Sequence, residues 1–136
     1  MEILNKYKIP YKDIKLYEVA FTHTSYANEN NLESYERLEY LGDAVLELVM
    51  SEYLYNNFSL KEGKMTKMRA NYVCENALYE YANILKLNDY IKLGKGEQVH
   101  DGYHNKTIVA DVFESFIGAI YLDCGLEVVK SFIYKN

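Results

Sequence analysis

Acidic residues recur at helical spacing in the segment between residues 34 and 57. Glu36, Glu39 and Asp43 are three and four positions apart, which places them on one stripe over two turns of a helix. The opposite face carries the residues expected to meet the core, which are Leu38, Leu41, Val45, Leu48 and Val49. Apolar side chains also flank the acids, namely Tyr40, Leu46 and Met50. A helix that is apolar nearly all round is buried nearly all round, so we expect a second covering surface, which a partner subunit could supply.

A second pair of acids lies in a more apolar stretch. The sequence TIVADVFESFIGAIYL, residues 107–122, holds only two charged side chains, Asp111 and Glu114, and they are three positions apart. Thr107, Ser115 and Gly118 lie on the same side of the expected helix, so the acids occupy a stripe of small residues. A buried carboxylate without partners takes up a proton rather than stay charged. These two acids therefore require cations or close hydrogen-bond partners.

The two acidic pairs together have the chemistry of a divalent-cation site. Two carboxylates about 4 Å apart repel by about 4 kcal/mol at an effective dielectric constant of 20, and a divalent cation removes that cost. Oxygen ligands without histidine or cysteine favour Mg²⁺, or Mn²⁺ in its place, over zinc. The alternative is that the acids form structural ion pairs with Arg37, Lys67 or Arg69, and the spacing alone does not separate the two. Four acids on two strongly apolar helices are a costly arrangement for stability only, which favours the metal site.

Helical periodicity also predicts the elements that must position these acids. We expect helices over residues 13–22, 34–57, 64–85 and 106–122, a short helix over 87–91, and a last helix after Gly125. Polar joints separate them at residues 28–33 and 59–63, and residues 93–105 are expected to form the one long loop. Apolar–polar alternation of strand length is essentially absent. The expected fold class is therefore all-α, a helical bundle.

Length and composition restrict the class of protein further. The chain has 136 residues, enough for one domain with a core of its own, and 49% of them are hydrophobic. Its two cysteines, Cys74 and Cys124, exclude a disulfide scaffold, and we expect them to be small core residues. No signal-peptide pattern and no apolar run of membrane-spanning length occurs, so the expected location is cytoplasmic. A net charge of −5 argues against a broad basic surface, although a bound cation would change the sign locally.

Several motifs in this order and spacing resemble those of the ribonuclease III family. ERLEYLGDAVLEL at 36–48 is similar to the signature stretch of that family. The other matching segments are FTHTSYANEN at 21–30, EGKMTKMRANYVCE at 62–75, LGKGE at 93–97 and DVFESFIGAIYLDCG at 111–125. The resemblance covers nearly the whole chain and implies the all-helical endonuclease domain of a bacterial ribonuclease III over residues 1–136.

The resemblance assigns a role to each acidic position. The metal-binding carboxylates of the family fall on Glu39, Asp43, Asp111 and Glu114, and of these Asp43 and Glu114 match the most directly catalytic positions. A second acidic set, near the RNA strands, falls on Glu36 and Glu62. Members of the family are homodimers in which the signature helices pack across the two-fold axis. This arrangement implies that the flanking residues form the dimer interface, and these are Tyr40, Leu46 and Met50. Tyr40 replaces the phenylalanine that is usual at its position.

The family activity implied here is endonucleolytic cleavage of double-stranded RNA, dependent on Mg²⁺ and leaving 5′-phosphate and 3′-hydroxyl ends. The processes implied are ribosomal RNA processing and messenger RNA turnover. Bacterial members usually carry a C-terminal double-stranded-RNA-binding domain that this chain lacks, so we expect the chain to be a catalytic-domain fragment of a longer enzyme. Two other classes remain open: an RNA-binding module that has lost the chemistry, and a purely structural helical dimer.

Histidines and surface cations have simpler interpretations. We expect His23 to be a hydrogen-bonded structural histidine, and His100 and His104 to be loop residues rather than metal ligands. Lys64, Lys67 and Arg69 are open to two interpretations, as phosphate contacts or as plain solvated charges; Arg37 is expected to be structural.

Overall fold

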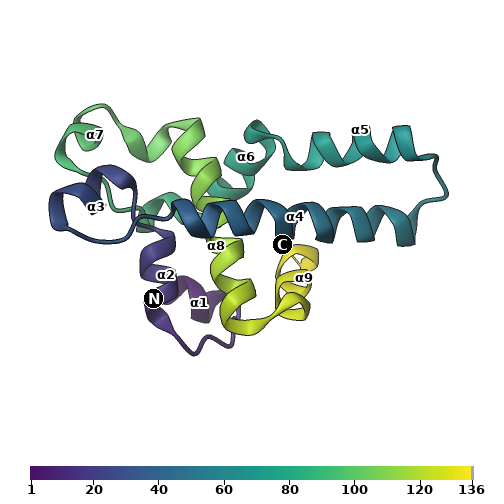
Figure 1. The fold of residues 1–136 in the computed structure, drawn as a ribbon, viewed down its shortest axis with the longest axis horizontal. Coiled ribbons are helices and arrows are strands. Elements are labelled where there is room, and N and C mark those ends of the chain that lie inside the picture. Colours follow the sequence, from purple (N-terminus) through teal and green to yellow (C-terminus); the bar gives the residue numbers. More distant parts are fainter. Residues whose placement is uncertain (136) are drawn as a thin grey trace.

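The fold is built around two long helices that cross at the centre of the molecule (Figure 1). The computed structural model describes residues 1–135, and over this range the chain is helical with no β-strand, which confirms the predicted all-α class. The first long helix is α4, Glu36–Asn57, and the second is α8, Lys106–Cys124. These two make the most extensive helix–helix contact, and 11 of the 19 residues of α8 are buried. The relative positions of the acids on α4 and α8 are therefore set by the packing of these two helices.

The ends of α8 follow from its sequence. Asn105 caps the N-terminus because its side chain accepts a hydrogen bond from the backbone N–H of Ile108, 3.1 Å away. Gly125, with φ +91°, ends the helix in a conformation that other residues rarely adopt. The last helix, α9, Leu126–Lys135, then packs back against α8 and buries Val129 and Phe132. Both boundaries agree with the sequence prediction to within a few residues.

The N-terminal part consists of three short helices, of which the second packs against α8. They are α1, Glu2–Lys6, α2, Ile14–Ala20, and α3, Thr24–Asn30. The sequence predicted one helix over 13–22 and a polar joint over 28–33, but α2 ends at Ala20 and a separate helix starts after His23. The reason is local: the His23 side chain accepts a hydrogen bond from the N–H of Ser25 and so caps α3. The helix α1 was not predicted, and it buries Ile3 and Leu4.

The predicted helix over 64–85 is broken into two. The helix α5, Glu62–Val73, ends at Cys74, whose backbone is extended with φ −69° and ψ 162°, and α6, Glu75–Leu85, starts directly after it. Figure 1 shows α5 lying beside the far half of α4, so the two form an arm that extends away from the body. Cys74 at the break is exposed and Cys124 is half-buried, so the prediction that both are core residues is wrong.

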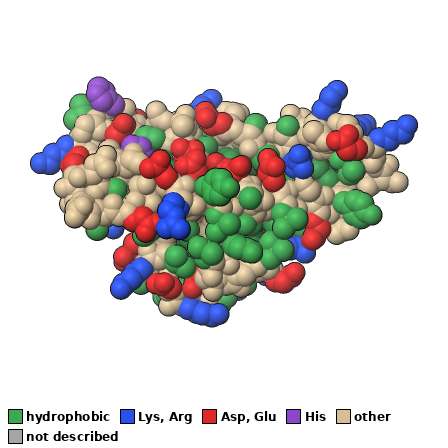
Figure 2. All heavy atoms as spheres, viewed as in Figure 1, with side chains coloured by type: hydrophobic (Ala, Val, Ile, Leu, Met, Phe, Trp, Pro, Cys, Tyr) green, Lys and Arg blue, Asp and Glu red, His purple; other side chains and the backbone are tan. Residues whose placement is uncertain are grey.

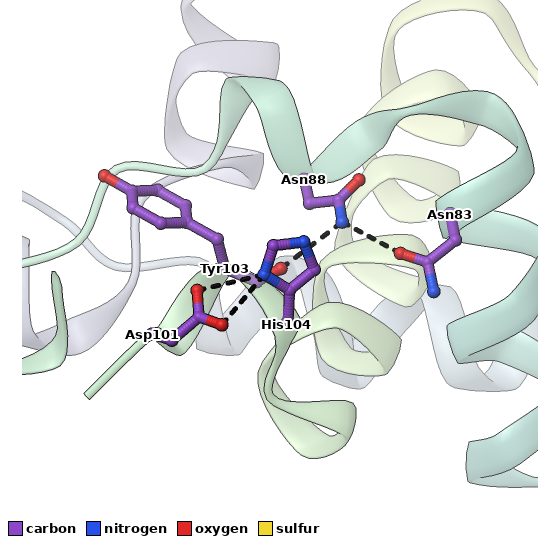
Figure 3. Close-up of polar contacts among 5 residues, drawn as sticks. All are labelled: Asn83, Asn88, Asp101, Tyr103 and His104. Atoms are coloured by element: carbon purple, nitrogen blue, oxygen red, sulfur yellow. Dashed lines mark hydrogen bonds and ion pairs between the residues drawn. The ribbon is translucent and has the colours of Figure 1, made fainter.

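The predicted long loop contains short helical turns of its own. After the 3₁₀ turn η1, Leu87–Tyr90, come α7, Lys95–Val99, and the 3₁₀ turn η2, Gly102–His104. Figure 3 shows how side chains tie these turns together: the Asn88 amide donates to Asn83 Oδ1 at 2.8 Å and to the Tyr103 carbonyl at 3.3 Å. His104 pairs with Asp101 at the surface, 2.9 Å away. Of the helices within residues 1–135, none combines the length and apolar character needed to cross a bilayer.

Candidate functional site

Two glycines set how closely α4 and α8 approach. A Cβ atom placed on Gly42 would collide with the backbone carbonyl of Glu114, and one placed on Gly118 would collide with the carbonyl oxygen of Leu38. The two helices therefore meet backbone to backbone at this crossing. Because Glu39 and Asp43 flank Gly42 on α4, the close approach places them beside the acids of α8. The geometry of the site thus depends on residues that have no side chain.

The crossing brings acids from both helices together. Glu39, Asp111 and Glu114 each offer a carboxylate oxygen, and these oxygens all lie within 4.8 Å of one another. Asp43 joins them through a hydrogen bond between its side chain and that of Glu114. We call Glu39, Asp43, Asp111 and Glu114 the acidic cluster. An open cleft is lined by three residues of the cluster, Glu39, Asp43 and Glu114, and by Glu36 and Tyr40. All four metal-site positions predicted from the sequence are therefore brought to one place.

Burial and mutual repulsion keep protons on the cluster. Burial, followed by the hydrogen bond and the charge of Asp43, raises the pKa of Glu114 to about 9. Burial and the neighbouring Asp111 raise the pKa of Glu39 to about 7. Burial also raises the pKa of Asp111, although hydrogen bonds from Glu39 and Tyr35 oppose this shift. Without a cation, Glu114 therefore keeps its proton at neutral pH and Glu39 is partly protonated, so the cluster does not carry four full charges.

The alternative of structural ion pairs finds no support in the geometry. Within residues 1–135 the ion pairs join Asp101 to His104 and Lys130 to Glu52 and Glu127, and none reaches the acidic cluster. Arg69 donates instead to the Ser51 hydroxyl, 2.8 Å away. An oxygen-only cluster of this kind, with raised proton affinity and no basic partner, suits a hard divalent cation such as Mg²⁺.

The remaining predicted site residues are not all in one place. Glu36 lines the acidic cleft. Glu62, by contrast, lies at the start of α5, at the far end of the arm, where it accepts a hydrogen bond from the Thr66 hydroxyl at 3.0 Å. Within one protomer Glu62 is therefore separate from the acidic cluster.

The predicted interface residues differ in their exposure to solvent. Tyr40 is 83% exposed beside the acids, and Met50 is half-buried. Leu46 is only 4% exposed and belongs to the core of its own protomer, so its assignment to the interface is wrong. Leu48, predicted to face the core, is instead 53% exposed. Figure 2 shows the result, a row of acidic side chains along the face of α4 with a broad apolar patch below it.

The histidines behave as structural or surface groups. His23 Nδ1 is 2.7 Å from the Ser25 hydroxyl, and burial lowers the pKa of the ring, which fits the predicted structural role. His100 is exposed on the loop, and His104 is engaged with Asp101.

One residue of the site was missed in the sequence. Tyr35, directly before α4, is 3% exposed, and burial together with the nearby charges of Asp111 and Glu39 raises the pKa of its hydroxyl. The only signal in the sequence is an aromatic residue at the expected start of a helix, and this says nothing about a contact with a residue 76 positions later.

Comparisons with known proteins agree on one family. The family described as Ribonuclease-III-like matches residues 13–136. Ribonuclease 3 of Clostridium tetani is 49% identical over 137 residues, covering 99% of this chain and 58% of the relative. Ribonuclease 3 of Listeria monocytogenes is 50% identical over 129 residues, covering 92% of this chain and 56% of the relative. The chain therefore spans less than three-fifths of the length of these relatives.

A solved structure matches over nearly the whole fold. The nuclease domain of ribonuclease III from Campylobacter jejuni is 36% identical, with a TM-score of 0.92, covering 98% of this chain and 92% of that domain. The description of that structure reports flexibility in a region involved in dimer formation.

Proposed function

This chain belongs to the ribonuclease III family, and we propose that it is a metal-dependent endoribonuclease domain that cleaves double-stranded RNA. The observation that carries this proposal is the acidic cluster itself. Oxygens of Glu39, Asp111 and Glu114, from two crossing helices, converge within 4.8 Å, and no lysine or arginine of residues 1–135 forms an ion pair with them. The enzymes named Ribonuclease 3 supply the reaction class, and the cluster supplies residues that fit it.

The four acids of the cluster would hold the divalent cation, for which we propose Mg²⁺ with Mn²⁺ able to replace it. When bound, the cation supplies charge neutralisation, Lewis-acid activation of water and stabilisation of the leaving oxygen in an in-line displacement at phosphorus. The chain itself provides a rigid frame: Glu39 and Asp43 are fixed to α4, and Asp111 and Glu114 to α8. Asp43 is exposed, so it faces the side from which a phosphate group can approach.

Proton handling falls to Glu114 and Asp43. Glu114 carries a proton at neutral pH in the cation-free state and shares it with Asp43 through their hydrogen bond. Loss of that proton leaves two carboxylates at the position where the RNA phosphate would lie, and both can then act as ligands or accept a proton from water. We propose that Asp43 and Glu114 are the catalytic pair, and that cleavage leaves 5′-phosphate and 3′-hydroxyl ends.

We also propose that the chain forms a homodimer, because the surface beside the acids has both an exposed aromatic ring and an apolar groove that could receive the same ring of a second copy. Next to the 83% exposed ring of Tyr40 lies an open groove, partly apolar. Its apolar lining includes Leu16, Val19, Leu38, Leu41 and Leu122. In a two-fold interface the same patch is used by both copies, so the Tyr40 ring of each protomer can cover the groove of the other. Two active sites then face the two strands of one duplex, and Glu36 and Glu62 lie near those strands.

We propose that the biological substrates are ribosomal RNA precursors and messenger RNA in the cytoplasm, by analogy with the bacterial relatives. An RNA-binding module without chemistry and a structural dimer are less well supported, because neither requires four converging acids on buried helices.

A cleavage assay on a labelled RNA duplex, with Mg²⁺ or with a chelator, tests this function. We expect Mg²⁺-dependent products with 5′-phosphate ends, which Glu114→Gln abolishes. Glu80→Gln makes the same chemical change at an exposed position of α6 outside the cluster and should cleave like the wild type. Duplex binding without cleavage at any Mg²⁺ concentration would point to the binding module instead, and no binding at all to the structural dimer.

A further inference from the structure

The helix α2 forms one wall of the apolar groove that lies next to Tyr40. Leu16 and Val19 of α2 line this groove and are half-buried, whereas Tyr17 is fully buried in the core. The end of α8 contributes Leu122 to the same groove, where it is 54% exposed. The shape of the groove therefore depends on how α2 lies against the end of α8.

The Asp123 carboxylate, near the end of α8, holds the start of α2 through three hydrogen bonds. Its Oδ2 accepts from the backbone N–H of Lys12 at 2.9 Å, and its Oδ1 accepts from that of Asp13 at 3.0 Å. Oδ2 also accepts from the Tyr17 hydroxyl at 2.8 Å, one turn into the helix. Burial opposes ionisation of this carboxyl, but the hydrogen bonds outweigh it and lower the pKa of Asp123. An ionised group with both oxygens engaged thus joins donors that lie 106 to 111 positions earlier in the chain.

A separate hydrogen bond holds the other end of α2. The hydroxyl of Ser115, which is 0% exposed, donates to the carbonyl of Ala20, the last residue of α2, at 2.6 Å. The groove-lining residues of α2 lie between this attachment and that of Asp123. Loss of the Asp123 carboxylate would therefore release the start of α2, next to Leu122, while the bond to Ser115 keeps the end of the helix in place.

We propose that Asp123 is a positioning residue for the dimer: by fixing the start of α2 against the end of α8, it shapes the groove that receives the Tyr40 ring of a second copy. The inference rests on the proposed homodimer and deepens it, because it identifies what prepares the receiving surface. Pre-organisation of an interface increases affinity by reducing the conformational freedom lost on association. Removal of the Asp123 carboxylate should therefore weaken dimerisation under conditions in which each protomer stays folded.

Asp123→Asn tests this directly, because an amide has one acceptor oxygen and cannot accept hydrogen bonds on both sides. Tyr17→Phe is a milder variant that keeps the buried ring and removes only the hydroxyl. Sedimentation equilibrium should show a dimer dissociation constant raised roughly tenfold by Asp123→Asn and raised less by Tyr17→Phe. Asp89→Asn, at an exposed position of η1, makes the same change of charge, and Tyr81→Phe removes a hydroxyl that donates to the Tyr72 carbonyl at 3.1 Å. Both of these controls should dimerise like the wild type.

Two further readouts separate positioning from a general loss of stability. Duplex cleavage per protomer by Asp123→Asn should be low at low enzyme concentration and should recover at concentrations above its dissociation constant, because the dimer then forms again. In a double-mutant cycle with Tyr40→Leu, the two changes should weaken dimerisation less than additively, because both act on the same contact.

The outcomes separate this inference from the proposed function. A wild type that is monomeric at micromolar concentration overturns the proposed homodimer and the inference with it. A wild type that dimerises without cleaving duplex RNA overturns the proposed nuclease activity, and sedimentation then decides the inference by itself. An unchanged dissociation constant in folded Asp123→Asn, or additive effects with Tyr40→Leu, overturns the inference alone, as does cleavage that stays low where the variant is dimeric. If Asp123→Asn does not fold, Tyr17→Phe takes its place, and an unchanged dissociation constant in that variant overturns the inference.

Discussion

Protons and cations compete for the same oxygens in the acidic cluster. Burial and the close contact with Asp43 raise the pKa of Glu114 to about 9, and burial with Asp111 raises the pKa of Glu39 to about 7. Each pKa lies above 4.5, the ordinary value of a glutamate side chain. The folded protein therefore binds protons that the unfolded chain has already lost at neutral pH. Two consequences at the level of single residues can be measured.

The first concerns stability without metal. In the unfolded chain Glu114 ionises near pH 4.5, whereas in the folded protein it does so near pH 9, so the free energy of unfolding should fall as pH rises between these values. Because Glu114 is only half-buried, water screens part of this cost and we expect a loss of about 1–2 kcal/mol. Glu114→Gln cannot ionise, so in chelator it should be more stable than the wild type at pH 8 and nearly equal at pH 4. Thermal unfolding across this range measures the difference. An amide variant that is clearly less stable than the wild type at pH 8 would indicate that the carboxylate has a stabilising partner.

The second concerns the linkage of Mg²⁺ to protons. A cation held by Glu39 and Glu114 must displace their protons, so its binding near pH 7 should release about one proton or more. Calorimetric titrations in two buffers of different ionisation enthalpy give this number, and the Mg²⁺ affinity should increase from pH 6 to pH 9. An affinity independent of pH would show that the cation uses oxygens that are already ionised.

At the scale of helices, the crossing of α4 and α8 explains both what the sequence predicts and what it does not. Apolar periodicity located both helices and all four acids, since these patterns are carried by the side chains themselves. Of the predicted buried face of α4, Leu38, Val45 and Val49 are buried as expected, whereas Leu48 is exposed. Leu46, predicted to lie beside the acids, is buried instead. A glycine contributes nothing to a hydrophobic pattern, so the close approach of α4 and α8 at Gly42 and Gly118 cannot be predicted from apolar periodicity.

Two helix ends also carry no clear signal in the sequence. The break at Cys74 lies within a run that keeps helical spacing on both sides, without proline or glycine, so no local residue marks it. The start of α3 depends on a histidine cap, and histidine is not among the preferred capping residues. The effect of Asp111 on the pKa of Tyr35 is a product of tertiary packing and could not be derived from spacing at all.

The glycine crossing leads to a prediction about stability and site geometry together. Gly42→Ala and Gly118→Ala each place a methyl group against backbone atoms of the facing helix, which cannot move aside as a flexible side chain would. We expect each to lower the free energy of unfolding by roughly 3 kcal/mol and the melting temperature by roughly 10 °C, and to weaken Mg²⁺ binding. Gly63→Ala and Gly96→Ala are the controls, because a Cβ there has no atom within 4 Å, and each should be neutral or slightly stabilising. Equal melting temperatures for the two sets would contradict the close packing of the helices.

At the scale of the whole molecule, the apolar patch beside the acids requires a cover. Tyr40 and Leu122, which line the same groove, are each more than half exposed, an arrangement more typical of an interface than of a free surface. The proposed dimer buries this patch and completes the surface that receives RNA.

Tyr40→Glu tests the dimer because it places a charge in the apolar interface without touching the core. The variant should sediment as a monomer at micromolar concentration, keep its helical content and lose duplex cleavage. Tyr55→Glu, which changes a tyrosine that is 76% exposed near the end of α4, serves as a control and should behave like the wild type. A wild type that is itself monomeric at this concentration would contradict the dimer.

The balance of charge predicts how the dimer meets RNA. One chain has a net charge of −5, so a dimer has −10, and long-range attraction to a phosphate duplex is absent or reversed. Binding must then come from local cations and bound Mg²⁺, and the exposed residues Lys64 and Lys67 on α5 are the proposed contacts. Each neutralised phosphate adds about 0.9 to the slope of log K against log salt, so Lys64→Gln with Lys67→Gln should lower that slope by about 2.

Filter binding of the cleavage-defective Glu114→Gln protein to duplex RNA over a salt series measures this slope. Lys6→Gln, on α1, removes an equally exposed charge far along the chain from α5 and should leave the slope unchanged. Cleavage by the wild type should be detectable at low salt and high enzyme concentration and should be lost near physiological ionic strength, because few phosphate contacts act against an unfavourable net charge. Efficient cleavage at physiological salt, with a slope that the double variant does not change, would mean that other residues provide the RNA surface.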